Sequence, residues 1–136
     1  MKLLFTTGSL VHGGAERHSI TLANRLAERG HAVHFAYIKN DPSQLERLRG
    51  AASVECLQAA KYLDRHAVSR LGDLLERTKP DAVVAANPYA MFYSTLALRS
   101  AGVSAPLAVT YHTTVLPGAK SWLQMLYYRP FFWNGR

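Results

Sequence analysis

The feature that most constrains this chain is a glycine-rich segment near its start. An apolar run ends at Phe5, a loop containing Gly8 follows, and the pair Gly13-Gly14 opens a long helical pattern. The order of strand, glycine-rich turn and helix is typical of α/β proteins, in which backbone N–H groups and the positive end of a helix dipole face an anion. We therefore predict an anion-binding turn before the first helix, with the rest of the chain as its scaffold.

Hydrophobic patterns predict five strands that alternate with helices. The expected strands cover residues 2–6, 32–38, 53–57, 82–86 and 107–111. The expected helices cover residues 14–29, 64–78 and 89–101, with a short helix around Leu45 and Leu48 and an aromatic-rich tail at about 119–133. This alternation is typical of βαβ units. We predict an α/β fold: a doubly wound, Rossmann-like parallel sheet with helices on both faces.

The strands of such a sheet end at one edge, and ligands of doubly wound proteins bind outside that edge. The segments expected there are residues 7–14, 39–41, 87–89 and 112–114. We therefore expect the glycine turn, Asn87 and His112 to lie near one another.

Composition limits the classes of function. The chain has 136 residues, enough for one ordinary domain, and no apolar run long enough for a membrane-spanning helix. A net charge of +7 favours a phosphorylated ligand or an anionic surface. We expect no nucleic-acid partner, because the basic residues are scattered and no nucleic-acid-binding module is visible. The single cysteine, Cys56, indicates a cytoplasmic protein, and no Cys/His spacing predicts a metal site.

Two common glycine loops do not fit the turn. Gly8 and Gly13 have the separation of a P-loop, but the next two residues are not the required lysine and hydroxyl residue. In a dinucleotide fingerprint counted from Gly8, Leu10 would obstruct the pyrophosphate. Asp41 lies where a ribose-binding acid would be, so an NAD-binding or other nucleotide-binding Rossmann module stays open as an alternative. A purely structural join between loop and helix stays open as well.

Four segments taken in order resemble a known family. They are residues 13–17 (GGAER), 26–33 (LAERGHAV), 79–84 (KPDAVV) and 109–112 (VTYH). Together they resemble the N-terminal, acceptor-side domain of GT-B glycosyltransferases of family 4, retaining enzymes that use nucleotide-diphosphate sugars. The resemblance covers essentially the whole chain. It implies two Rossmann-like domains that face each other across a cleft, with residues 1–136 as the first.

The resemblance also assigns roles to single residues. By position, Gly13 and Gly14 match the glycine loop that approaches the donor diphosphate. His112 matches the active-site histidine that contacts the transferred sugar, and we take it as the catalytic residue, with Thr113 beside it as a substrate-binding residue. A histidine satisfied by backbone groups at the end of a strand is the alternative for His112.

Three more residues are included as substrate-binding residues. Glu16 and Arg17 belong to the glycine motif, and would bind an acceptor hydroxyl and a phosphate or acidic acceptor respectively. A charge that suits the helix dipole and a solvated arginine are the alternative interpretations. Asn87 stands where many relatives have histidine, so its role is open.

The function implied is transfer of a sugar from a nucleotide-diphosphate sugar to a hydroxyl of a glycan or lipid-linked acceptor, without metal or cofactor. In the family, the second domain carries most of the donor site, including a pair of glutamates, and the given chain ends before it. We expect this fragment to be inactive alone and to meet a donor domain in cis or on a separate subunit. A truncated domain that only binds acceptor or phosphate is the alternative.

The aromatic-rich tail permits a further expectation. Trp122 and Trp133, with Lys120 and Arg129 nearby, suit a peripheral contact with the inner face of the cytoplasmic membrane. Packing of these aromatics on the sheet or on the second domain is the alternative.

Overall fold

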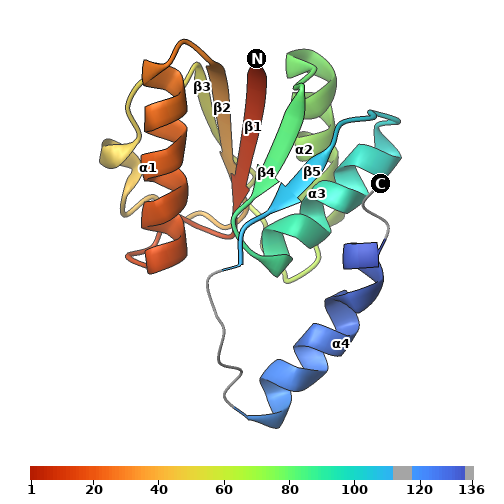
Figure 1. Ribbon diagram of the computed structural model, residues 1–136. Coiled ribbons are helices and arrows are strands. Elements are labelled where there is room, and N and C mark those ends of the chain that lie inside the picture. The colour runs from red at the N-terminus through yellow and green to blue at the C-terminus, as the bar shows by residue number, and fades with distance from the viewer. Residues whose placement is uncertain (112–117, 134–136) are drawn as a thin grey trace.

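The computed structural model describes residues 1–111 and 118–133 (Figure 1). Its strands are β1 (Lys2–Thr7), β2 (Ala32–Tyr37), β3 (Ser53–Cys56), β4 (Ala82–Ala85) and β5 (Leu107–Val109). Its helices are α1 (Gly14–Glu28), η1 (a 3-10 turn, Leu45–Arg47), α2 (Arg65–Thr78), α3 (Pro88–Ser100) and α4 (Ala119–Trp133). The sheet has the order β3-β2-β1-β4-β5 and every pairing is parallel. The predicted doubly wound, Rossmann-like fold is confirmed.

β1 is the centre of the sheet and is buried on both faces. Leu3 and Phe5 pack with α1, whereas Leu4 between them packs with α2 and α3 on the opposite face. Because side chains alternate across a strand, a central strand covered by helices on both sides reads as a continuous apolar run. Figure 1 shows α1 on one side of the sheet and α2 and α3 on the other.

The ends of the elements follow local chemistry. Gly30, with φ 83°, follows the C-cap of α1, where glycine commonly adopts positive φ, and Lys79, with φ 45°, ends α2. Asp64 is the N-cap of α2 and accepts a hydrogen bond from the His66 N–H at 2.9 Å. β5 is shorter than predicted, since its partner β4 already ends at Ala85.

α4 lies beyond the carboxyl edge of the sheet, against α3 (Figure 1). Tyr128 is buried, and its ring lies 6.4 Å from that of Phe92 on α3, centroid to centroid. Trp122 and Leu123 are exposed, at 63% and 66%. One face of the tail therefore packs on the domain while apolar side chains of another face solvent. No helix among the described residues combines the length and apolarity needed to cross a bilayer.

Acid should weaken the cap of α2. Hydrogen bonds from the N–H groups of Ala60, His66 and Ala67 hold the pKa of Asp64 below its usual 3.8. A depressed pKa stabilises the fold above the unfolded value and loses that contribution as the pH falls through the folded value. We expect the melting temperature of the wild type to fall more than that of Asp64→Asn between about pH 5 and pH 3. Asp73→Asn, on the same helix, is the control, and equal slopes for all three proteins would contradict the assignment.

Candidate functional site

The carboxyl ends of β1, β2 and β4 meet at one edge of the sheet, the lower edge in Figure 1. Backbone hydrogen bonds continue past the strands there. The Lys39 N–H donates to the Gly8 carbonyl at 2.9 Å, and the Ala86 N–H donates to the Thr6 carbonyl at 2.9 Å. These bonds fix the start of the glycine turn between the loops that follow β2 and β4.

The turn itself is held by the segment after β2. Leu10 is fully buried; its N–H donates to the Asp41 carbonyl at 2.9 Å, and its carbonyl accepts from the Gln44 N–H at 2.9 Å. The Gln44 side chain is also fully buried, and its Nε2 donates to the Val11 carbonyl. Sequence reasoning missed Gln44 because its partners lie more than thirty positions away and its immediate neighbours are ordinary surface residues.

The two adjacent glycines of the turn differ in role. Gly13 is the N-cap of α1, with an extended φ of −135°, and its N–H donates to the Val11 carbonyl at 2.9 Å. A Cβ added at Gly14 would meet nothing within 4 Å. A glycine pair at a helix start permits positive φ, but neither Gly13 nor Gly14 adopts it. The opening beside Gly14, rather than an unusual backbone shape, is what permits a close approach.

The start of α1 has no side-chain cap. Among residues 1–111 and 118–133, no acceptor is found for the N–H groups of Gly14, Ala15 and Glu16. Three unpaired donors at the positive end of a helix form an anion-binding arrangement. The Gly14 N–H belongs to this group, whereas the Gly13 N–H is already bound to the Val11 carbonyl and is not a free donor.

Glu16 lies across this helix start. A Cβ added at Gly13 would collide with the Glu16 carboxylate, so the side chain folds back over the N-cap. Glu16 occupies the third position of α1, where a carboxylate suits both the dipole and a capping geometry. An anion that enters this site must therefore compete with the Glu16 carboxylate.

Asn87 is the N-cap of α3. Its Oδ1 accepts from the Ala90 N–H at 2.8 Å. Its Nδ2 lies 3.7 Å from the position of a Cβ built on Gly8. The Asn87 side chain therefore has a structural role through one atom and turns its amide donor towards the glycine turn, as expected for a residue of this edge.

Tyr89 and Lys39 complete the edge, in two of the segments predicted to lie there, although nothing in the sequence indicated that they contact each other. The Lys39 Nζ lies 5.7 Å from the centroid of the Tyr89 ring, a cation–π contact. The Tyr89 ring also contacts those of Tyr62 and Tyr93. Burial raises the pKa of the Tyr89 phenol well above its usual value, so the ring stays neutral beside Lys39. Gly8 packs directly on this ring, since a Cβ there would lie 3.3 Å from Tyr89 Cδ1.

The remaining predicted residues are placed as follows. Arg17 is exposed and lines a groove with Arg47 and Arg49 on one side of α1. His112 and Thr113 lie outside the described residues, and the chain reaches the edge through Thr110, whose N–H donates to the Ala85 carbonyl at 2.9 Å. In the part of the chain that the structure describes, no three His, Cys, Asp or Glu side chains form a metal-binding group.

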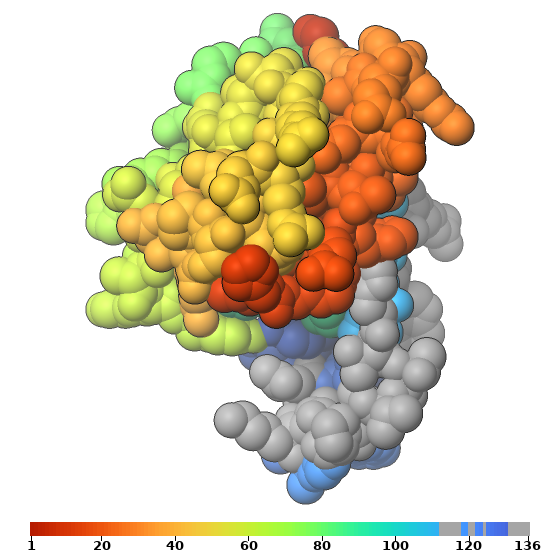
Figure 2. Space-filling view, turned by 90° about the vertical axis from the view of Figure 1, so that its left-hand side faces the viewer, coloured from red at the N-terminus to blue at the C-terminus, as the bar shows by residue number. Residues whose placement is uncertain are grey.

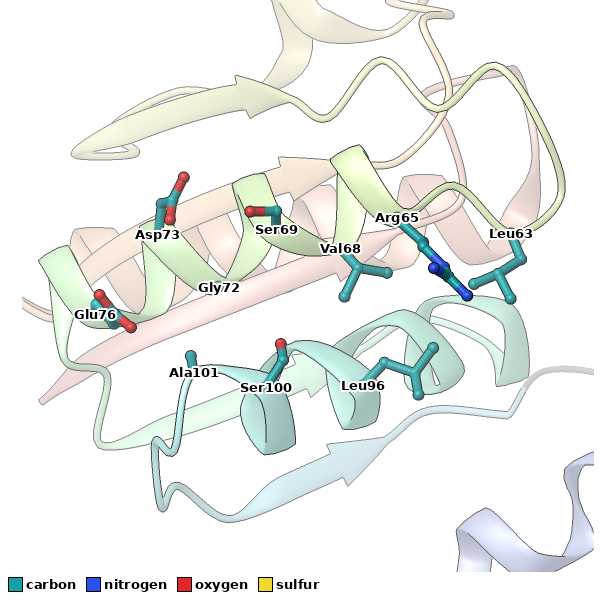
Figure 3. Close-up of a pocket in the computed structure, with 10 residues that line it drawn as sticks. All are labelled: Leu63, Arg65, Val68, Ser69, Gly72, Asp73, Glu76, Leu96, Ser100 and Ala101. Atoms are coloured by element: carbon teal, nitrogen blue, oxygen red, sulfur yellow. The ribbon is translucent and has the colours of Figure 1, made fainter.

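A groove larger than the one beside Arg17 lies on the other face of the sheet. It measures about 580 Å³ and runs between α2 and α3 (Figure 3). Val68 and Leu96 point into it from facing helices, and Arg65 lies near one end and Glu76 near the other. None of the predicted site residues lines this groove, so its size does not make it the candidate site.

Comparison with known proteins identifies the family of this chain. The sequence model of Glycosyltransferase Family 4 matches residues 12–135. The chain belongs to glycosyltransferase family 4. No curated protein matches it significantly in sequence.

Solved structures share the fold of this family 4 domain. HepE of Anabaena, solved with UDP and glucose, has a TM-score of 0.69 at 18% identity, over 94% of this chain and 35% of its own. The apo lipopolysaccharide outer core galactosyltransferase WaaB has a TM-score of 0.64 at 17% identity, over 80% of this chain and 32% of its own. MurG of Acinetobacter baumannii has a TM-score of 0.61 at 16% identity, over 79% and 33%. The family 4 chain spans about a third of the length of these proteins.

The two functions of Asn87 can be separated by substitution. Asn87→Ala removes the cap of α3 and should lower the free energy of unfolding by about 1 kcal/mol. Asn87→Asp keeps a capping oxygen but loses the amide donor, so we expect near wild-type stability. Chemical denaturation of the three proteins provides the measurement. A loss in Asn87→Asp as large as in Asn87→Ala would show that the amide donor also supports the fold.

Gly8 and Gly14 should respond differently to the same substitution. Gly8→Ala presses on the Tyr89 ring, which Tyr62 and Tyr93 hold in place, and should cost about 1 kcal/mol. Gly14→Ala meets open space within a helix and should raise stability by up to about 0.5 kcal/mol. Thermal melts of both variants test this, and similar destabilisation of the two would show that the helix start does not accommodate a side chain at position 14.

Proposed function

We propose that this chain is the N-terminal, acceptor-side domain of a retaining GT-B glycosyltransferase. The complete enzyme moves a sugar from a nucleotide-diphosphate sugar to a hydroxyl of a glycan or lipid-linked acceptor. One observation carries the proposal: a family 4 sequence whose first helix starts at the carboxyl edge of the sheet with three unpaired N–H donors beside an open Gly14. Membership of this family also favours sugar transfer over the NAD-binding alternative.

The start of α1 stabilises negative charge on the donor. In the reaction the bond between the sugar and the diphosphate breaks, and charge grows on the leaving diphosphate. Fixed N–H donors and a helix dipole stabilise that charge without reorganising during the reaction. Glu16 swings away from Gly13 when the diphosphate enters, because the carboxylate and the diphosphate repel each other. The structure of HepE with UDP and glucose supports a nucleotide sugar as the class of donor.

The acceptor binds at the part of the edge formed by Asn87 and Lys39. Asn87 Nδ2 donates to a sugar or acceptor hydroxyl, while the Lys39 ammonium attracts a negatively charged acceptor. We assign His112 as the residue that positions the transferred sugar, with Thr113 beside it, on the basis of the family motif. Glu16 and Arg17 contact the acceptor or its charged groups from the glycine motif.

A second domain supplies the rest of the donor site, either in cis or on a separate subunit. The 136-residue chain by itself then binds ligand without transferring sugar. We place the enzyme in the cytoplasm, with the exposed apolar side chains of α4, Trp122 and Leu123 among them, at the inner surface of the membrane where a lipid-linked acceptor is found.

Nucleotide binding tests the proposal directly. We expect UDP or GDP to raise the melting temperature of the chain more than NAD does at equal concentration. Gly14→Val fills the opening beside the helix start and should remove most of that shift, whereas Gly14→Ala should keep part of it. A larger shift with NAD, or an unchanged UDP shift in Gly14→Val, would refute diphosphate binding at this turn.

A further inference from the structure

A basic groove lies beside α1, apart from the cation–π contact between Lys39 and Tyr89 at the sheet edge. It is a groove of about 340 Å³ between α1 and the segment 45–49. Figure 2 looks onto this side of the molecule, with α1 in orange and the following loop segments in yellow. We call it the arginine groove. The side chains that matter for its chemistry are Arg17, Asn24, Arg25, Glu28, Arg47 and Arg49.

The arginine groove carries an uncompensated positive charge. Four arginines line it. The only carboxylate among the lining residues is that of Glu28, which forms an ion pair with Arg25 at 3.1 Å. That pair is well exposed and contributes little. In the described part of the chain, Arg17, Arg47 and Arg49 form no ion pair. Like charges gathered in one cavity repel each other, so an anion that enters it relieves that repulsion.

One amide holds the backbone of the far wall, which carries Arg47 and Arg49. Asn24 Nδ2 donates to the Arg47 carbonyl and Asn24 Oδ1 accepts from the Arg49 N–H, both at 2.8 Å. These two bonds tie the backbone of the segment 45–49 to α1 across more than twenty residues of sequence. The backbone of this wall therefore needs no ordering when a ligand binds, and only the arginine side chains lose conformational freedom.

We propose that the arginine groove binds a ligand carrying two or more phosphate groups. The guanidinium fork matches phosphate oxygens in pairs and keeps its charge at any physiological pH. Four guanidinium groups around one cavity suit several phosphates better than one. The groove shares Arg17 with the proposed acceptor contacts but includes neither Gly14 nor the unpaired N–H groups of the helix start, and its occupation does not require sugar transfer. The phosphates belong either to a soluble phosphorylated compound or to lipid headgroups.

Titration with inorganic pyrophosphate is the first test. Arg47→Gln combined with Arg49→Gln removes two groups that could each form a charge-assisted hydrogen bond, and should weaken binding at least about tenfold. Arg65→Gln combined with Arg99→Gln gives the same net charge from exposed positions outside the groove and should bind as the wild type does. Glu28→Gln removes the opposing carboxylate and should tighten binding. Because pyrophosphate would also bind at the proposed nucleotide site, the titration is repeated in the Gly14→Val background, where adding Arg47→Gln and Arg49→Gln should still weaken binding at least about tenfold.

Vesicles distinguish the two sources of phosphate. The protein is sedimented with phosphatidylglycerol vesicles. If Arg47→Gln/Arg49→Gln no longer binds the vesicles while Arg65→Gln/Arg99→Gln still does, the groove binds lipid headgroups. Groove-dependent pyrophosphate binding without vesicle binding would assign it to a soluble ligand. Equal losses in the two double variants, or no binding of either probe by the wild type, would overturn the proposal.

Discussion

The double burial of β1 is the constraint on which the rest of the domain depends. Its backbone pairs with β2 on one side and β4 on the other, and its side chains pack against helices above and below. Parallel pairing in the same direction forces the three carboxyl ends to one edge. The glycine turn, Lys39 and Asn87 are neighbours for that reason, since nothing in their own segments brings them together.

The sequence predicts the framework well, because periodicity is a local property. Covered strands read as apolar runs, and the glycine motif marks the start of α1 within one residue. What it does not reveal are side chains whose meaning depends on distant partners. In the sequence Gln44 is an ordinary polar loop residue, and its role depends on its hydrogen bond to Val11. The packing of Gly8 on Tyr89 likewise requires that β1 and β4 are paired.

Glu16 illustrates a different limit. The motif indicates that the residue belongs to the proposed site, but not that its carboxylate folds over Gly13. A carboxylate there is favourable by itself, because it meets the positive end of the dipole. At the proposed site a bound anion would replace the Glu16 carboxylate, so its affinity would reflect the difference between two anions rather than the full strength of the helix dipole.

The anchoring of the glycine turn has a kinetic consequence. Gln44 and the Leu10–Asp41 hydrogen bond make the turn part of the core, so its shape is established during folding. A ligand of the proposed site would meet a surface that is already ordered, so that its binding would require only the displacement of the Glu16 side chain. A chain that keeps the glycines but loses the buried amide would have to order the turn at every encounter, and would bind more slowly for that reason.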